Sequence, residues 1–378
     1  MSQKIKAARL DQLRITEKTV WSFVRLETES GLTGCGEATV PQGHAGLRDA
    51  ARRWLPPLVG ETLDGLKFMR AVNSDAPLAD NALLCALDMA AHDLEGQILG
   101  KPVYDILGGA KRHAIELYAN INRTTTDRSP SGFAASATRA RAQGFSTFKI
   151  APFDEITPDV CATADFEAQL AKGLERIAAT REAVGPQSRL RVDCHWRFTA
   201  AAAAAMIAAV NGLQLDWIEC PIAEDPHNAP DIADLRRLAH RQEIRLAGLE
   251  MGTGVEAFMP FLRAGSYDVI MPDVKYLGGL RVVAELQAVC DAHGAVVSPH
   301  NPSGPICHAA SLHACAALPR VELLEMQFDE SPWFDGILAG PGVQRSGGFS
   351  APPSGPGLGV ALSPEAIQPL RIDDVASF

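Results

Sequence analysis

The chain has 378 residues, enough for two or three domains with a large buried core. Hydrophobic residues make up 47% and charged residues 21%, and the formal net charge is −10, so the composition argues against disorder and against a basic nucleic-acid-binding surface. No two of the eight cysteines have C-x-x-C spacing, and the first residues lack the apolar run of a secretory signal. A cytoplasmic protein with reduced thiols, binding neither nucleic acid nor membrane, is therefore expected.

The first 113 residues are predicted to form an α+β domain. Residues 20–28 are rich in β-branched and aromatic side chains, Gly31 lies in a turn, and residues 32–38 continue as a second strand, which together predict a hairpin. Residues 44–108 are predicted to be mainly helical, because the segment from 82 to 94 carries a broad apolar face.

Residues 114–335 alternate between short apolar strands and helical segments. The eight strand candidates are 115–121, 145–150, 190–194, 215–220, 244–250, 268–273, 295–299 and 321–326. This alternation predicts the α/β class and a (β/α)8 barrel of the TIM type. A doubly wound open sheet is the alternative, but no G-x-G-x-x-G or P-loop motif supports it. Residues 336–378, rich in Gly and Pro, are predicted to return to the N-terminal domain.

Seven consecutive strand candidates end in an ionisable residue. In chain order these residues are Lys149, Asp193, Glu219, Glu250, Asp273, His300 and Glu325, and His195 follows Asp193 by two positions. The carboxyl ends of barrel strands meet at one mouth, which is where the active sites of such barrels lie. These side chains are therefore expected to share one pocket.

Three acidic residues on adjacent strands predict a cation site. Asp193, Glu219 and Glu250 would converge within a few ångströms, and three carboxylates cannot all stay ionised together without a cation. Oxygen-only ligation suits a hard cation, so Mg²⁺ is the expected metal. The alternative is that the three are ordinary solvated acids at strand ends.

Two histidines are candidates for proton transfer. Asp273 and His300 lie on neighbouring strands, and a carboxylate that orients a histidine raises its basicity, so His300 is the expected general base. His195 shares its side of the strand with Asp193 and is open to three roles, namely general acid, metal ligand or substrate binder. The alternative for either histidine is a purely structural role.

Lys149 and Glu325 have less determined roles. Lys149 would hold a substrate carboxylate or simply be an exposed lysine at a strand end. Glu325 would polarise that carboxylate if burial keeps it protonated, and otherwise it would support the residues that contact substrate.

The layout resembles the enolase superfamily, and within it the mandelate racemase-like subgroup, over nearly the whole chain. The motifs that carry the resemblance are the hairpin 31–38, the metal-ligand strand ends 192–195, 217–221 and 246–250, the His–Asp dyad in 272–280 and 298–301, and the eighth-strand acid in 323–325. The resemblance implies that the N-terminal domain caps the barrel, and that Mg²⁺ stabilises an enediolate formed when a base removes the α-proton of a carboxylate substrate.

Two positions depart from the common pattern of this family. Many relatives carry K-x-K on the second strand, but here Ala151 replaces the second lysine, which argues against racemases and cycloisomerases that need it. Leu249 stands where glycine is frequent before the third metal ligand. The D-x-H of Asp193 and His195 is instead similar to that of galactonate-type acid-sugar dehydratases.

The resemblance thus implies a lyase that dehydrates an aldonate-like sugar acid to a 2-keto-3-deoxy acid. In such a reaction His300 takes the C2 proton and His195 protonates the departing C3 hydroxyl. An epimerase, a cycloisomerase or another lyase with the same site is the alternative, and an inactive barrel or a metal-dependent hydrolase would be different classes. Specificity is expected from residues 15–50, with Trp21, Thr39, Gln42 and His44 as candidates. A homo-oligomer, either a dimer or an octamer, is expected from the resemblance.

Overall fold

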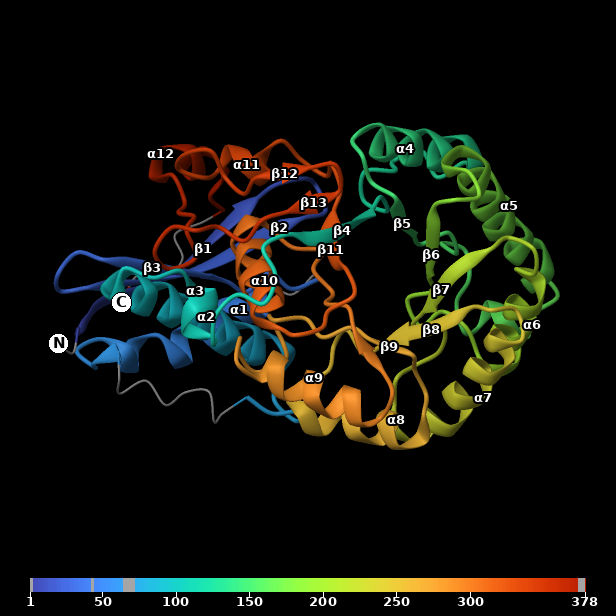
Figure 1. Cartoon of the computed structure of the whole chain (residues 1–378), viewed down its shortest axis with the longest axis horizontal. Helices are drawn as coiled ribbons and strands as arrows, with labels where there is room; N and C mark the ends of the chain where they lie inside the picture. The colour runs from blue at the N-terminus through green and yellow to red at the C-terminus, as the bar shows by residue number, and fades with distance from the viewer. Residues whose placement is uncertain (1–2, 42–43, 64–71, 373–377) are drawn as a thin grey trace.

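The structure is a computed structural model that describes residues 3–41, 44–63, 72–372 and 378. An antiparallel sheet is formed by β1 (Ile5–Arg14), β2 (Val20–Thr28) and β3 (Thr33–Glu37). Helices α1 (His44–Trp54) and α2 (Leu78–Leu99) share an apolar core with this sheet. We call this part the cap, and Figure 1 shows it on the left of the molecule.

Helix α2 lies directly on strand β3. A Cβ atom added at Gly34 would lie 2.2 Å from the backbone oxygen of Ala90, and one at Gly36 would lie 1.8 Å from that of Ala86. The two glycines therefore allow helix and strand to approach more closely than any larger residue permits.

A parallel barrel occupies the rest of the molecule. Its strands are β4 (Ile115–Asn120), β5 (Thr147–Ile150), β6 (Arg189–Asp193), β7 (Leu215–Glu219), β8 (Arg245–Gly248), β9 (Val269–Ile270), β10 (Val296–Val297) and β11 (Leu324–Gln327). The ladder runs in chain order, and β11 pairs with β4. Glu322 donates its N–H to Val297 and Glu325 donates to Pro299, which connects β10 to the β11 segment. All eight strand candidates are confirmed, and so is the barrel.

Seven helices surround these strands in the order of the chain (Figure 1). They are α4 (Pro130–Ala142), α5 (Phe166–Val184), α6 (Ala200–Ala209), α7 (Ala229–His240), α8 (Met259–Ala264), α9 (Val282–Ala292) and α10 (Pro305–Ala317). The last strand is followed by a single turn, α11 (Trp333–Gly336), rather than by a full helix. Shorter elements are α3 (Val103–Ile106), α12 (Pro364–Ile367) and the 3₁₀ turns Pro56–Leu58, Val160–Ala162, Pro226–Asn228, Val255–Phe258 and Gln368–Leu370. Across the described residues, every helix is too short or too polar to cross a membrane.

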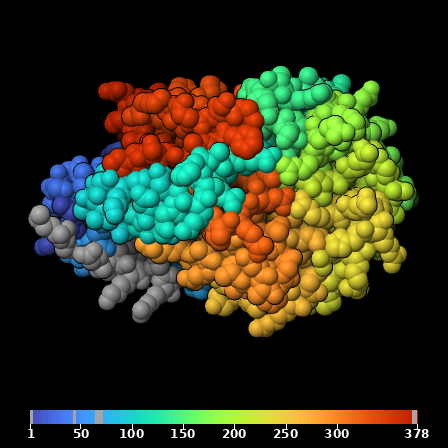
Figure 2. Space-filling view, viewed as in Figure 1, coloured from blue at the N-terminus to red at the C-terminus, as the bar shows by residue number. Residues whose placement is uncertain are grey.

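The C-terminal segment joins the barrel to the cap. Strands β12 (Arg345–Ser346) and β13 (Phe349–Ser350) form a hairpin, and β13 pairs antiparallel with β4 of the barrel. The chain then returns to the cap, where Arg371 forms a bridge with Leu13 of β1. In Figure 2 this segment, in red, lies between the cyan part of the cap and the green part of the barrel. The described part of this segment thus contacts both the barrel and the cap, and the hairpin on β4 was not predicted.

A carboxylate of the cap also binds the start of a barrel helix. Glu37 of β3 is buried, and its side chain accepts the N–H groups of Gly304 at 2.7 Å and Cys307 at 3.0 Å. These N–H groups lie at the start of α10 and have no acceptor within the helix, so a carboxylate at this end stabilises the helix. The cap thus supplies part of the N-terminal capping of the helix that follows His300.

Buried charges close the floor of the barrel, opposite its mouth. The Arg191 guanidinium is fully buried, 3.4 Å from the centre of the Trp217 ring, and its Nε donates to Asp216 at 2.9 Å. A second arginine, Arg245, binds Asp216 and Glu322, and Glu322 also accepts from Arg191 at 3.0 Å. Two arginines and two carboxylates therefore form one network at the N-terminal ends of the strands.

Two buried histidines of α10 predict a loss of stability in acid. Burial lowers the pKa of His308 to about 3 and that of His313 to about 4. Both are neutral in the folded protein but take up protons near pH 6.5 when it unfolds, so acid favours the unfolded state. Protonation of each histidine in the unfolded state is expected to lower the free energy of unfolding by about 2 kcal/mol between pH 7 and pH 5. Urea unfolding at the two pH values measures this.

The variant His313→Gln isolates one of these contributions. It is expected to lose about 2 kcal/mol less than the wild type over the same pH interval, because glutamine does not titrate. The same pH dependence in both proteins would contradict this assignment.

Candidate active site

The mouth of the barrel opens into a cavity of about 1020 Å³ beneath the β1–β2 hairpin. Thr19 and Thr39 of the cap line it on one side, and Glu250, Lys275 and His300 line it on the barrel side. The cavity therefore lies where cap and barrel meet, over the carboxyl ends of the strands.

Lys149 of β5 is the centre of the charge cluster below this cavity. Its Nζ lies 2.6 Å from Glu219 Oε1, 2.9 Å from Glu325 Oε1 and 3.6 Å from Asp193 Oδ2. Burial alone lowers the pKa of a lysine, but here the carboxylates outweigh burial and hold the pKa of Lys149 well above its usual range. Lys149 is thus a fixed cation, not an exposed lysine at a strand end.

One lysine does not neutralise the acids around it. Burial raises the pKa of Glu219 to about 8 despite the opposing effect of Lys149. Burial, together with the charge of Asp193, raises the pKa of Glu250 well above its usual range. Asp193 keeps a lowered pKa, because His195 and Lys149 outweigh its burial. The cluster therefore holds more carboxyl groups than its own cations can keep ionised.

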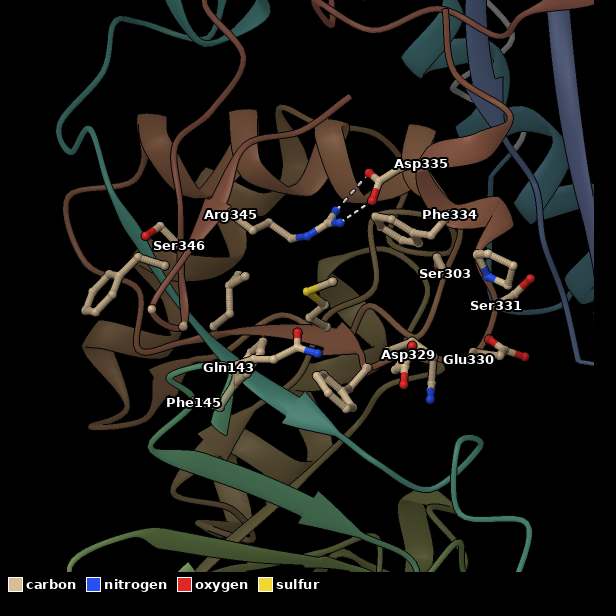
Figure 3. Close-up of a pocket in the computed structure, with 18 of the residues that line it drawn as sticks. Gln143, Phe145, Ser303, Asp329, Glu330, Ser331, Phe334, Asp335, Arg345 and Ser346 are labelled. Atoms are coloured by element: carbon tan, nitrogen blue, oxygen red, sulfur yellow. Dashed lines mark hydrogen bonds and ion pairs between the residues drawn. The ribbon is translucent and has the colours of Figure 1, made fainter. Parts of the chain in front are cut away.

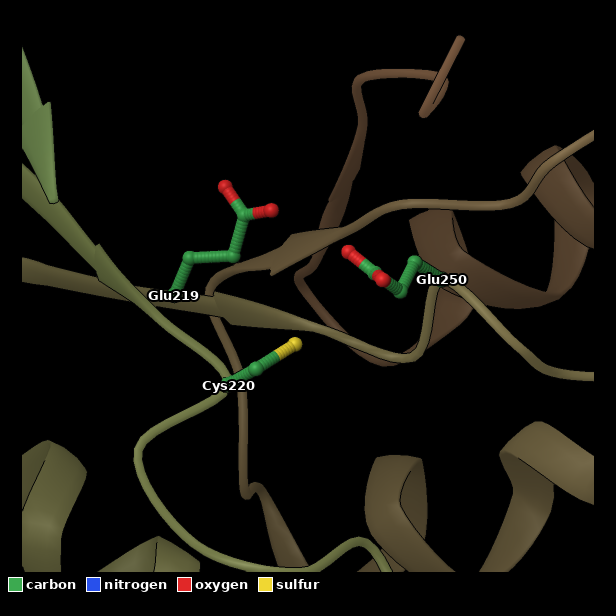
Figure 4. Close-up of side chains that lie close together, drawn as sticks. All are labelled: Glu219, Cys220 and Glu250. Atoms are coloured by element: carbon green, nitrogen blue, oxygen red, sulfur yellow. The ribbon is translucent and has the colours of Figure 1, made fainter. Parts of the chain in front are cut away.

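The residues present fit a bound cation. Carboxylate oxygens of Glu219 and Glu250 lie within 4.8 Å of each other, and Figure 4 shows both side chains directed toward the same gap. Glu250 Oε2 is buried and has no hydrogen-bond partner within the described ranges, although His300 Nε2 lies 3.3 Å from it. A buried carboxylate oxygen without a hydrogen bond is costly unless a cation occupies the gap. The Cys220 sulfur belongs to the same group of atoms.

His300 and Asp273 form a hydrogen-bonded pair. His300 follows β10, and Asp273 follows the neighbouring strand β9. His300 Nδ1 lies 2.9 Å from Asp273 Oδ2. The pKa of Asp273 is lowered, because Lys275 and His300 outweigh its burial, so the carboxylate is ionised and only accepts hydrogen bonds. Nδ1 must then carry the proton, which leaves His300 Nε2 as the basic nitrogen, 3.3 Å from Glu250 Oε2.

His195 contacts Asp193 and does not line the cavity. Its ring Nε2 is 3.0 Å from Asp193 Oδ2, and its backbone N–H donates to Asp193 Oδ1 at 2.9 Å. The side chain is 37% exposed. The structure therefore brings His195 to the first carboxylate of the cluster and leaves it accessible to solvent.

Glu325 of β11 is surrounded by donors. Besides Lys149, Asn120 Nδ2 donates to its Oε1 at 2.7 Å and the N–H of Asn301 donates to its Oε2 at 3.0 Å. Although burial acts in the opposite direction, Lys149 and His300 lower the pKa of Glu325 to about 2. These contacts favour an ionised carboxylate that orients its neighbours over a protonated one.

Sequence analysis missed two polar residues of this site. Asn120 ends β4, the one barrel strand for which no polar end residue was predicted. Its position at a strand end could have identified it as a site residue. Lys275 donates to Asp273 Oδ2 at 2.6 Å, on the same oxygen that binds His300. It follows Asp273 by two positions, as His195 follows Asp193.

A second cavity, of about 350 Å³, lies between β4, β11 and the C-terminal hairpin. Arg345 binds Asp335 in its wall, next to Phe334 (Figure 3). None of the eight predicted site residues lines it. Of the candidates for specificity, Trp21 lines this second cavity and Thr39 lines the larger one. Gln42 and the side chain of His44 lie outside the described residues.

The chain is similar to known proteins along nearly its whole length. Residues 132–366 match the enolase C-terminal domain-like family, and residues 12–108 match the N-terminal domain of mandelate racemase / muconate lactonizing enzyme. A D-galactonate dehydratase of Verminephrobacter eiseniae is 29% identical over 95% of this chain and 92% of its own. A D-galactarolactone cycloisomerase of Agrobacterium fabrum is 27% identical over 93% of this chain and 91% of its own.

The fold has close counterparts among solved structures. A mandelate racemase/muconate lactonizing enzyme from Jannaschia sp. CCS1 superposes with a TM-score of 0.83 over 98% of each chain, at 24% identity. Cap and barrel both match at the level of sequence, and the resemblance predicted from the strand-end motifs is confirmed. The chain therefore belongs to the mandelate racemase/muconate lactonizing enzyme family of the enolase superfamily.

Proposed function

We propose that this protein is a Mg²⁺-dependent lyase that dehydrates an aldonate-like sugar acid to a 2-keto-3-deoxy acid. The observation that carries the proposal is the basic Nε2 of His300, fixed by Asp273 and placed beside the carboxylate cluster. Alanine at position 151 leaves the second strand without a second lysine base. The galactonate dehydratase relative, aligned along nearly the full chain, supports dehydration over racemisation.

Each residue has a defined part in this proposal. Lys149 binds the substrate carboxylate, and Glu325 keeps Lys149 in place through their 2.9 Å contact. His300 Nε2 removes the proton from C2, and Asp273 stabilises the imidazolium that results. His195 gives a proton to the C3 hydroxyl, which leaves as water, and the enol product then becomes the 2-keto acid.

Asp193, Glu219 and Glu250 would hold Mg²⁺. When bound, Mg²⁺ supplies positive charge for the substrate carboxylate, whose negative charge grows as C2 loses its proton. The excess of carboxyl groups over cations in the cluster supports this assignment, as does the oxygen of Glu250 that has no hydrogen bond within the described residues.

A substrate screen tests the proposed reaction. Purified protein with Mg²⁺ would be incubated with aldonic and aldaric acids, and 2-keto products would be detected as semicarbazones. The variant Asp193→Asn would be screened in parallel. A product that forms with the wild type and not with the variant supports the proposal, and product formation that survives Asp193→Asn or metal removal contradicts it.

Separate roles for the two histidines lead to a specific prediction. The variant His195→Asn is expected to dehydrate its substrate about 10²- to 10⁴-fold more slowly, because the C3 hydroxyl lacks its acid. His300 remains able to exchange the C2 proton with solvent. Nuclear magnetic resonance in D₂O would therefore show deuterium entering C2 of unreacted substrate.

The control for this experiment is His227→Asn, which alters a histidine with a side chain that is 87% exposed. It is expected to leave both dehydration and exchange unchanged. Loss of exchange along with dehydration in His195→Asn would assign His195 to the first step instead.

The second candidate function is cycloisomerisation or epimerisation of a related acid with the same site. The similarity to a galactarolactone cycloisomerase favours it. C2 exchange with no loss of hydroxyl in the wild-type protein, across all acids tested, would support this candidate over dehydration.

A further inference from the structure

The loops that carry the proposed metal ligands contain residues in left-handed backbone conformations. Leu249, directly before the third ligand, has φ +71°, and Cys220, directly after the second, has φ +45°. Trp196, on the loop that follows the first ligand, has φ +56°. Residues other than glycine rarely adopt these values, so the surrounding structure must hold them.

One carboxylate contacts all three of these residues. Glu224 Oε1 accepts the backbone N–H of Leu249 at 2.6 Å and lies 3.6 Å from the Cys220 sulfur. Glu224 Oε2 accepts the indole N–H of Trp196 at 2.9 Å. Tyr267 adds a fourth donor, with its hydroxyl 2.8 Å from Oε1. Glu224 therefore links the three ligand loops without being a ligand itself.

The chain is shaped to admit this carboxylate. A Cβ atom at Gly248 would lie 2.3 Å from Glu224 Oε1 and 2.6 Å from the Tyr267 ring. The last residue of β8 must therefore be glycine for Glu224 to reach the N–H of Leu249. Gly248 provides the space, and Leu249 takes the strained conformation that aims the next side chain.

We propose that Glu224 is a positioning residue for the divalent-cation site. It holds Leu249 and Cys220 in left-handed conformations, and so directs the adjacent carboxylates of Glu250 and Glu219 toward one point. The Trp196 contact fixes the loop after Asp193 in the same way. This inference rests on the proposed metal-binding role of the three acids, and it explains how leucine can stand where glycine is frequent in the family.

Divalent-cation affinity tests the proposal without a substrate. The dissociation constant for Mg²⁺ is measured by isothermal titration calorimetry of the metal-free protein. The dissociation constant for Mn²⁺ is measured on the same protein by titration followed by electron paramagnetic resonance. The variant Glu224→Gln is expected to bind about 10- to 100-fold more weakly, the usual effect of losing such a supporting contact. Glutamine has one acceptor oxygen in place of two, so at least one loop loses its partner.

A second substitution distinguishes positioning from general stability. Glycine adopts a φ near +71° without strain, so in Leu249→Gly the hydrogen bond from the N–H of residue 249 to Glu224 is less necessary for that conformation. The double variant Glu224→Gln/Leu249→Gly is expected to bind Mg²⁺ at least about fivefold more tightly than Glu224→Gln, a partial rescue of the loss given above. A residue that acts only through global stability would show no rescue, because Leu249 is buried and its removal weakens the core.

Asp93→Asn is the matched control. Asp93 is also a buried carboxylate that accepts two backbone N–H groups, from Cys35 and Leu358, but it belongs to the cap. Its variant is expected to lower the melting temperature and leave Mg²⁺ affinity unchanged. Equal losses of affinity in both variants would overturn the proposal, as would unchanged affinity in Glu224→Gln or absence of rescue. A wild-type protein that binds neither cation would instead overturn the metal site itself.

Discussion

Replacing His300 with asparagine is expected to slow both C2 proton exchange and dehydration by about 10²- to 10⁴-fold. Asparagine keeps a polar group beside Asp273 but has no basic nitrogen at the position of Nε2. Solvent exchange at C2, followed by nuclear magnetic resonance, measures the first step, and 2-keto acid formation measures the whole reaction. Both rates fall together, in contrast to the separate effects expected for His195→Asn.

Metal binding serves as the internal control for this variant. His300 is not one of the proposed ligands, so His300→Asn is expected to keep the Mg²⁺ affinity of the wild type. Turnover that remains intact while the metal is still bound would remove His300 from the role of general base.

Replacing Arg191 with methionine is expected to lower the free energy of unfolding by about 3–5 kcal/mol. The guanidinium is fully buried and lies over the rings of Tyr118 and Trp217. Its loss leaves Asp216 and Glu322 paired with Arg245. Breaking one member of such a network leaves buried charge uncompensated. Chemical denaturation followed by circular dichroism measures the change, and Mg²⁺ affinity of the folded variant should stay unchanged.

Arg189 on the same strand provides the comparison. Its side chain is 38% exposed and pairs with Glu116 at 2.7 Å. Arg189→Met is expected to cost at most about 1 kcal/mol, because exposed ion pairs contribute little. Similar losses for the two variants would show that burial of the Arg191 network is not what stabilises the barrel floor.

The barrel could be predicted from the sequence because its signal repeats. Each strand is a short apolar run, and the ionisable residue at its end recurs once per strand and helix. Even β9 and β10, with two paired residues each, were recognisable from this repetition. The same regularity placed Lys149, Asp193, Glu219 and Glu325 together, since neighbouring parallel strands end at one mouth.

Contacts between residues far apart in the sequence leave no repeating pattern from which they could be predicted. Nothing in the sequence around Glu224 shows that its carboxylate reaches Leu249, which lies 25 positions later. The link between Glu37 and Cys307 spans 270 positions. The hairpin on β4 was not predicted, although the adjacent Gly347 and Gly348, which both have positive φ in the structure, suit a tight turn.

The contact of Glu37 with α10 limits how freely the cap could be exchanged during evolution. The two N–H groups that Glu37 accepts belong to the barrel, on the segment that follows His300. A cap taken from a relative would therefore have to bring its own acceptor to the same place, or leave the first turn of α10 without partners. Changes in the loop between β1 and β2 would leave this contact in place, because Glu37 lies on β3.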